Sequence, residues 1–209
     1  MSNLWFYSDC HFNHGNICIY AGRPCIKPEW LNEKGWWVSP EAAIACAEHM
    51  NEWLIGRINS RVKDGDTVIH VGDFCNKGRN KGVEGLRESA AVIEKKLNGK
   101  WIFTKGNHDK NNGLKYGIDF MKMKIAKLDM FIQHRPVYDL REIPDDTDLC
   151  VVGHVHEKWK VNWIEDSMIP NINVGPEVND YYPIRLDELV GKYGKLMGER
   201  WREKNELGK

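Results

Sequence analysis

The chain has 209 residues, 42% hydrophobic and 29% charged, and its 30 basic residues balance 30 acidic ones. This length is typical of one globular domain, and we expect a single domain over residues 1–209. The balanced charge provides no global field for nucleic acid, and no apolar run approaches the roughly 20 residues needed to cross a bilayer.

The start of the chain and its cysteines indicate the compartment. Residues 1–8 lack the basic start and longer apolar segment of a secretory signal, so we expect a cytoplasmic protein with no membrane contact. The six cysteines contain no Cys-x-x-Cys pair and are interpreted as reduced thiols, with a thiolate zinc site as a less favoured alternative: Cys10, Cys18, Cys25, Cys46, Cys75 and Cys150.

Short apolar segments that end in polar clusters indicate an α/β fold. The expected strands are Leu4–Ser8, Thr67–Val71, Trp101–Thr104, Met130–Ile132 and Leu149–Val152. They run into Asp9-Cys10-His11, Gly72-Asp73, Gly106-Asn107-His108-Asp109, His134 and Gly153-His154-Val155-His156. Open α/β sheets usually bind ligands at the carboxyl ends of their strands, so these clusters predict one site.

Three helices are expected. Apolar residues three and four apart predict a helix over Pro40–Asn59, capped by Ser39. A second is expected over about Val83–Leu97, with Asn98-Gly99 as its C-cap, and a third begins near Leu186. The charged segment 192–209 is interpreted as a frayed end.

Aromatic residues are concentrated in the segment 15–39, which we interpret as a loop inserted before the first helix. It contains Tyr20, Trp30, Trp36 and Trp37. Rings near a phosphate site can stack on a nucleobase, but such rings more often cover a core, and we favour the second interpretation.

The polar clusters supply the oxygen and nitrogen donors that borderline divalent ions favour. Asp9 and His11 are two apart on a segment expected to be extended, so both can face one side, and His154 and His156 repeat this spacing. The carboxylate of Asp73 can bridge two ions with its two oxygens, and Asn107 adds a neutral amide oxygen. A two-metal centre is therefore predicted.

The order of these motifs from Leu4 to about Pro176 resembles the calcineurin-like metallophosphoesterase superfamily. The segment Asp9–Ile17, followed by Arg23-Pro24, resembles its small bacterial and phage-type members. The resemblance implies an α/β fold, a four-layer αββα sandwich of two mixed β-sheets flanked by helices, in which Asn173-Val174-Gly175 is scaffold. It also implies a ligand set for two metals: Asp9, His11, Asp73 and His156 for the first, and Asp73, Asn107, His134 and His154 for the second.

The same resemblance implies the chemistry. Two divalent ions, for which Mn²⁺ is favoured over Fe²⁺, Ni²⁺ or Zn²⁺, would share a hydroxide that attacks phosphorus. His108 would act as the general acid for the leaving oxygen, with a purely structural loop histidine as the alternative.

Three residues are candidate substrate contacts: His14, Arg23 and Lys77. For His14 and Arg23 a loop contact with the backbone is the alternative, and for Lys77 a solvated loop. Asn76 and Lys77 stand where Asp and Arg are frequent in the phosphoprotein phosphatases, which argues against a protein phosphatase.

The expected activity is hydrolysis of a phosphate ester, with a phosphodiester of a nucleotide or nucleic-acid fragment as the favoured substrate. A phosphomonoesterase or nucleotide pyrophosphatase with the same metals is the alternative. A mononuclear metal protein would leave half of the ligands idle. A non-catalytic binding module is disfavoured, because none of the ligand positions is lost. No obligate protein partner is expected.

Overall fold

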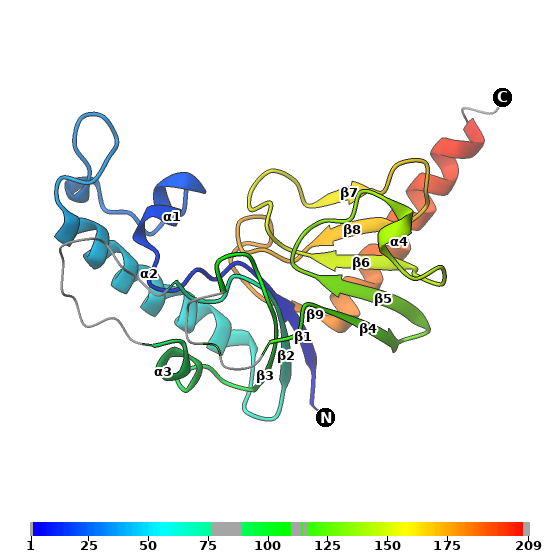
Figure 1. The fold of residues 1–209 in the computed structure, drawn as a ribbon, viewed down its shortest axis with the longest axis horizontal. Helices are drawn as coiled ribbons and strands as arrows, with labels where there is room; N and C mark the ends of the chain where they lie inside the picture. Colours follow the sequence, from blue (N-terminus) through cyan, green and yellow to red (C-terminus); the bar gives the residue numbers. More distant parts are fainter. Residues whose placement is uncertain (1, 77–88, 110–113, 115–116, 207–209) are drawn as a thin grey trace.

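A computed structural model describes residues 2–76, 89–109, 114 and 117–206, with side chains described as far as residue 199. Within these residues the chain forms two mixed β-sheets flanked by helices (Figure 1). The first sheet has the order β3-β2-β1-β9. Its strands β1 (Leu4–Tyr7), β2 (Thr67–Val71) and β3 (Lys100–Thr104) are parallel, and β9 (Ile184–Arg185) is antiparallel to β1.

The second sheet has the order β4-β5-β6-β8-β7. Its central strands β5 (Leu128–Gln133), β6 (Leu149–Val152) and β8 (Pro170–Asn173) are parallel. The edge strands β4 (Phe120–Ile125) and β7 (Val161–Trp163) are antiparallel to their neighbours. In Figure 1 the arrowheads of β5, β6 and β8 face the middle of the molecule, where β1 and β2 also end. The parallel strands of both sheets therefore deliver their carboxyl ends to one region.

Strand β1 contributes side chains to two hydrophobic cores, one on each face of the first sheet, because successive residues of a strand point to opposite faces. Phe6 packs between the sheets with Ile69 of β2 and Ile132 of β5. Trp5 and Tyr7 point to the other face, where they pack with the helices. The first sheet is thus buried on both sides, which explains its nearly continuous apolar strands.

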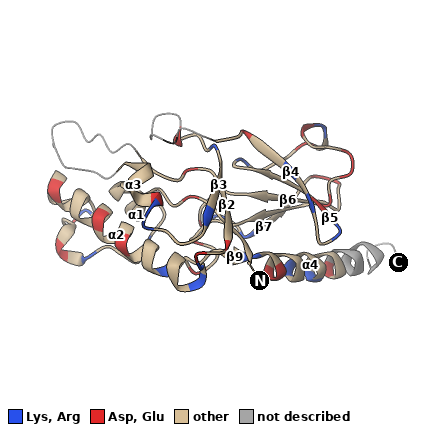
Figure 2. Cartoon of the chain, turned by 90° about the horizontal axis from the view of Figure 1, so that it is seen from below, with Lys and Arg blue, Asp and Glu red and all other residues tan. Residues whose placement is uncertain are grey.

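The main helix of that outer layer is α2 (Pro40–Arg61). The hydroxyl of Ser39 accepts a hydrogen bond from the Ala42 amide, and α2 buries Ala47, Met50, Leu54 and Ile58 of the predicted apolar face, while Ile44 is half-buried. The colours of Figure 2 mark acidic residues toward the start of α2 and basic residues at its end, and Glu41 in the first turn and Arg61 in the last are placed as the helix dipole favours.

The remaining helices are shorter or lie at the end of the chain: α1 (Gly15–Tyr20), η1 (Pro28–Trp30), α3 (Ala90–Glu94), η3 (Leu140–Glu142) and α4 (Leu186–Glu206). The start of α4 agrees with the predicted third helix. Its apolar residues Leu189, Val190 and Tyr193 pack onto the core between the sheets.

The predicted second helix differs from the structure. Residues 83–88 lie outside the described residues, and α3 covers only Ala90–Glu94. Asn98 does not cap it. The Asn98 amide donates to Asn59 Oδ1 at 2.8 Å, and its side chain donates to the Val62 carbonyl at 3.0 Å. Asn98 therefore links the start of β3 to the end of α2 and does not end a helix of its own.

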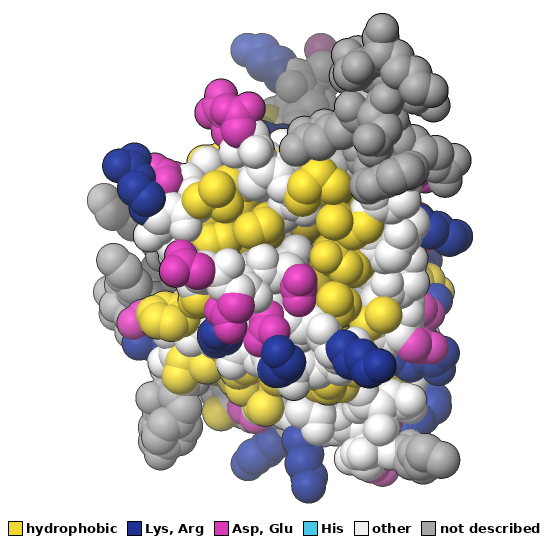
Figure 3. All heavy atoms as spheres, turned by 90° about the vertical axis from the view of Figure 1, so that its right-hand side faces the viewer, with side chains coloured by type: hydrophobic (Ala, Val, Ile, Leu, Met, Phe, Trp, Pro, Cys, Tyr) yellow, Lys and Arg dark blue, Asp and Glu magenta, His cyan; other side chains and the backbone are white. Residues whose placement is uncertain are grey.

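The face on the right of Figure 1 mixes hydrophobic, acidic and basic side chains, and no histidine of the described residues is visible there (Figure 3). None of the described helices is both long and apolar enough to cross a membrane.

Candidate metal centre

Hydrogen bonds join the loops that follow the strands of both sheets. The Asp9 and His11 amides donate to the carbonyls of Gly72 and Asp73, each at 3.0 Å, so the loop after β1 lies on the loop after β2. The His154 amide, after β6, donates to the Asp9 carboxylate at 2.9 and 3.1 Å. These contacts bring the predicted motifs of the two sheets together.

Asp9, His11 and His156 form a first group of candidate ligands. Each offers one donor atom, and these atoms lie within 4.8 Å of one another. Nε2 of His11 and Nε2 of His156 each lie 3.9 Å from Asp9 Oδ1. Asp9 and His11 are buried, and His156 is partly accessible.

Asp73, His134 and His154 form a second group with the same spacing. Nε2 of His134 lies 3.1 Å from Asp73 Oδ2 and 3.2 Å from Asn107 Oδ1, so the amide of Asn107 borders this group. The same Asp73 oxygen is 3.6 Å from His11 Nε2 in the first group. Asp73 therefore lies between the two groups.

The protonation of His11 fits metal binding. Both ring nitrogens are buried, and neither makes a hydrogen bond with the residues that the structure describes. An unpaired buried polar group costs free energy, which a metal ion would recover. Burial holds the pKa of His11 well below its usual value, so the ring is neutral and has a free lone pair.

His134 is oriented by a backbone carbonyl. Its Nδ1 is 2.9 Å from the Val71 carbonyl oxygen, which places the proton on Nδ1 and turns Nε2 toward Asp73. Burial opposes a charge on this ring, but Asp73 and Asp9 raise the pKa of His134 to about 9. The carboxylates of Asp73 and Asp9 therefore stabilise a positive charge between Nε2 of His134 and Asp73.

Glycines of the motifs allow this close packing. A side chain at Gly106 would collide with the carboxylate and amide of Asp73, and one at Gly153 would collide with the Asp9 carboxylate. The glycines in the Gly-Asn-His-Asp and Gly-His-x-His motifs are therefore required by the approach of backbone to ligand.

The backbone of the ligand pairs differs from the sequence prediction. Asp9, His11, His154 and His156 are not extended but have left-handed φ angles of 50°, 48°, 72° and 49°. Strand β1 already ends at Tyr7. Non-glycine residues with this geometry carry strain that is common at functional sites. The side chains converge because the chain turns at each ligand, not because alternate residues share a strand face.

His108 and His14 lie beside the first group. The ring of His108 is 5.2 Å from the ring of His11 and is exposed, while its amide donates to Asp73 Oδ1 at 2.8 Å. The ring of His14 is 5.5 Å from that of His11 and 6.2 Å from that of His108. Both histidines border the space in front of the candidate ligands.

Arg23 does not occupy the substrate-facing position that the sequence suggested. Its side chain is 2% exposed and pairs with Glu177 at 2.8 Å. It also donates to the carbonyls of Asp9 and Cys10 at 2.7 and 2.8 Å. Arg23 therefore stabilises the loop that carries Asp9 through hydrogen bonds to its backbone. Lys77, the third predicted contact, lies outside the described residues.

Two supporting residues were missed in the sequence. Asp109 accepts hydrogen bonds from the amides of Asp73, Phe74 and Gly106 at 2.7–3.0 Å, which binds two ligand loops together. Glu177 joins Arg23 to His156, whose Nδ1 is 3.4 Å away. Asp109 ends a motif that the sequence displays, whereas nothing near Glu177 in the sequence indicates its role. Asn173 is scaffold, since it donates to the His156 carbonyl at 2.9 Å.

Comparisons with known proteins indicate the family of the chain. A model of the calcineurin-like phosphoesterase family matches residues 2–170. Uncharacterized protein MJ1445 of Methanocaldococcus jannaschii is 29% identical over 196 residues, 91% of this chain and 90% of that protein. The solved structure of AQ665 from Aquifex aeolicus, a protein of unknown function, has a TM-score of 0.62 and 25% identity, covering 91% of this chain and 99% of that one. A solved archaeal phosphodiesterase is more distant, with a TM-score of 0.39 and 21% identity over 83% of each chain.

The chain belongs to the calcineurin-like phosphoesterase family. As a member of that family it is a metal-dependent phosphoester hydrolase, and the two sheets flanked by helices are the fold predicted from the sequence. Two groups of candidate metal-binding residues lie at the junction of the sheets.

Proposed function

We propose that the protein is a dinuclear phosphodiesterase that acts on a nucleotide or nucleic-acid fragment. The observation that carries this proposal is the position of Asp73, whose Oδ2 lies 3.1 and 3.6 Å from histidines of two separate ligand groups. A carboxylate between two groups can bind an ion on each side. Two divalent ions held there, most readily Mn²⁺, would activate water near neutral pH for attack on phosphorus.

The proposed ligands form two sets, and each set takes residues from both sheets. Asp9, His11 and His156 would hold one ion, while Asn107, His134 and His154 would hold the other, and Asp73 would serve both. Asp109 and Arg23 would position these ligands through the backbone bonds described above. His108 would donate a proton to the leaving oxygen, because its ring is exposed beside the first group.

A cavity beside the second group supports an anionic substrate. Its volume is about 390 Å³, and its lining includes Asn107, His134, Lys105 and Arg135. Arg135, next to His134, would attract a phosphate group and neutralise part of its charge, whereas Lys105 already pairs with Asp119 of the same lining at 3.7 Å.

Aromatic rings beside the first group support a substrate with a base. The His14 ring is 6.5 Å from the Tyr20 ring, which is 6.0 Å from the Trp36 ring. Tyr20 and Trp36 are 59% and 43% exposed, whereas Trp37 is buried. The exposed pair extends outward from the candidate metal centre, where it would stack on a nucleobase.

The test is turnover of bis-p-nitrophenyl phosphate and p-nitrophenyl phosphate by metal-stripped protein to which Mn²⁺ is restored. We expect faster turnover of the diester, dependence on metal, and loss of activity in Asp73→Asn. Asp146→Asn, an exposed carboxylate that pairs with Lys122, is the matched control and should remain active.

The alternatives predict other results. Preference for the monoester would support a phosphomonoesterase, and turnover of a nucleotide pyrophosphate bond alone would support a pyrophosphatase. No turnover of any of these esters with several metals would contradict catalysis and favour a binding module on this fold.

Three broader expectations stay predictions: a single domain over residues 1–209, a cytoplasmic location and function without an obligate protein partner. The six free cysteines, all buried, fit a reducing compartment.

A further inference from the structure

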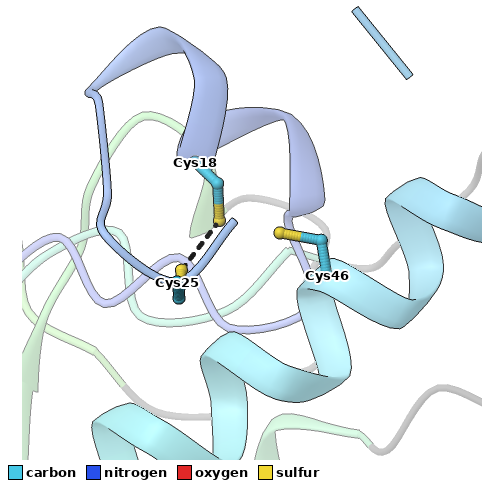
Figure 4. A group of neighbouring side chains, drawn as sticks. All are labelled: Cys18, Cys25 and Cys46. Atoms are coloured by element: carbon cyan, nitrogen blue, oxygen red, sulfur yellow. Dashed lines mark hydrogen bonds between the residues drawn. The ribbon is translucent and has the colours of Figure 1, made fainter. Parts of the chain in front are cut away.

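Three of the six cysteines meet in the helical layer, away from the histidine and carboxylate groups. Cys18 lies in α1, Cys25 in the loop that follows it, and Cys46 in α2. Their sulfur atoms lie within 4.8 Å of one another, and those of Cys18 and Cys25 are 3.4 Å apart. Figure 4 shows the three side chains converging from three separate segments.

The spacing of the sulfurs suits a single metal ion. Zinc binds thiolate sulfur at about 2.3 Å, so two sulfurs on a tetrahedral zinc are about 3.8 Å apart. The distances of 3.4 Å and at most 4.8 Å lie on either side of this value. A small adjustment of the side chains would therefore place all three sulfurs on one ion.

The surroundings supply a fourth sulfur and exclude water. The thioether of Met50 is 3.4 Å from the Cys18 sulfur and is a further soft donor. Nη1 of Arg23 is 3.2 Å from the same thioether, although the charge of Arg23 is already balanced by its ion pair with Glu177. Cys18, Cys25 and Cys46 are at most 2% exposed, which excludes competing water.

We propose that Cys18, Cys25 and Cys46 bind one Zn²⁺ ion in a structural site separate from the phosphoesterase centre. The ion would fasten α1 and its following loop to α2, joining a segment with one short helix to the longest described helix of that layer. This proposal does not depend on the identity of the substrate.

The sequence did not favour this site because its spacing is unusual. Six residues separate Cys18 from Cys25 and twenty separate Cys25 from Cys46, so no short pair of zinc ligands is visible. The cluster forms only because α1 folds back onto α2. The competing explanation is that the three thiols are small apolar residues that fill a core.

The first experiment uses the reduced, metal-stripped full chain, titrated with Co²⁺ in place of Zn²⁺. We expect thiolate-to-cobalt charge-transfer absorption that saturates with one thiolate-bound ion and is abolished by Zn²⁺. Nitrogen and oxygen ligands of the histidine and carboxylate groups cannot produce that absorption. Cys46→Ala and Cys18→Ala should lose it, while Cys150→Ala, a buried cysteine of β6, should retain it.

A second measurement avoids any effect of the substitutions on folding. Wild-type protein is first loaded with Mn²⁺, then given one equivalent of Zn²⁺, and zinc-edge X-ray absorption is recorded. Sulfur neighbours at about 2.3 Å would support the site. Zinc surrounded only by nitrogen and oxygen, or cobalt absorption that persists in Cys46→Ala, would overturn the proposal.

Discussion

His108 is distinct among the site histidines because its ring is exposed while its amide is bonded to Asp73. His108→Gln keeps the backbone that positions Asp73 but removes an imidazole proton donor. We therefore expect kcat to fall by roughly 10²–10⁴-fold while two metal ions remain bound. Steady-state kinetics and metal analysis of the same sample check both parts. Unchanged turnover with bound metal would leave His108 a structural residue.

The protonation of His134 gives a pH-dependent prediction for the metal-free protein. Its pKa is raised from 6.5 to about 9, so the folded state binds a proton that the unfolded state releases. The resulting stability is complete below pH 6.5 and is lost as the pH rises through about 9. The difference in unfolding free energy between wild type and His134→Gln should therefore shrink over this range. A difference that grows with pH would contradict the assignment.

The candidate ligands could be predicted from the sequence because each lies within a short motif after an apolar segment. The support behind them could not. Arg23 and Glu177 are 154 residues apart, and a buried ion pair at that separation leaves no local pattern. The sequence therefore suggested a substrate contact for Arg23, whereas its burial behind Asp9 shows a positioning contact.

At the scale of the loops, Gly106 sets the approach of the Gly-Asn-His-Asp segment to Asp73. In Gly106→Ala the new methyl group would collide with the Asp73 carboxylate and amide, so we expect loss of metal binding and of turnover. The matched control is Gly191→Ala in α4, where no atom lies within 4 Å of an added carbon. That change should raise the free energy of unfolding by about 0.5–1 kcal/mol. Full metal binding in Gly106→Ala would show that the loop adapts.

The aromatic segment allows a test of substrate class. Tyr20→Ala removes an exposed ring of the proposed stack, and stacking on a base contributes about 1–3 kcal/mol. The KM for a dinucleotide should rise at least several-fold with little change in kcat. Tyr138→Ala, which removes an equally exposed ring elsewhere, is the control. Equal KM values for the two variants would argue against base stacking at Tyr20.

The elements differ in how readily the sequence predicts them. Central strands such as β2 and β6 are apolar runs, interrupted in β2 only by Thr67 and His70, so their existence and bounds could be predicted. The edge strand β4 alternates exposed and half-buried residues and contains two lysines, and β9 has only two residues. Such segments become strands through pairing with a neighbour, which local sequence does not specify.

Across the whole molecule, the candidate centre joins the two sheets. Each ligand group takes residues that follow strands of both sheets, since His156 completes the group of Asp9 and His11, and His134 and His154 lie against Asp73. A bound ion in either group would therefore link the sheets as well as activate water. The family match agrees with the observed fold. The proposal of two ions depends on the position of Asp73 between the two groups.

The measurement that tests this most directly is a count of bound Mn²⁺ by native mass spectrometry. Manganese is chosen because it favours oxygen and nitrogen donors over the cysteine cluster. Wild type and Asp146→Asn should each bind two ions, and Asp73→Asn should bind fewer at the same metal concentration because both groups lose a shared carboxylate. One ion at saturation in wild type, or two equally tight ions in Asp73→Asn, would contradict a centre bridged by Asp73.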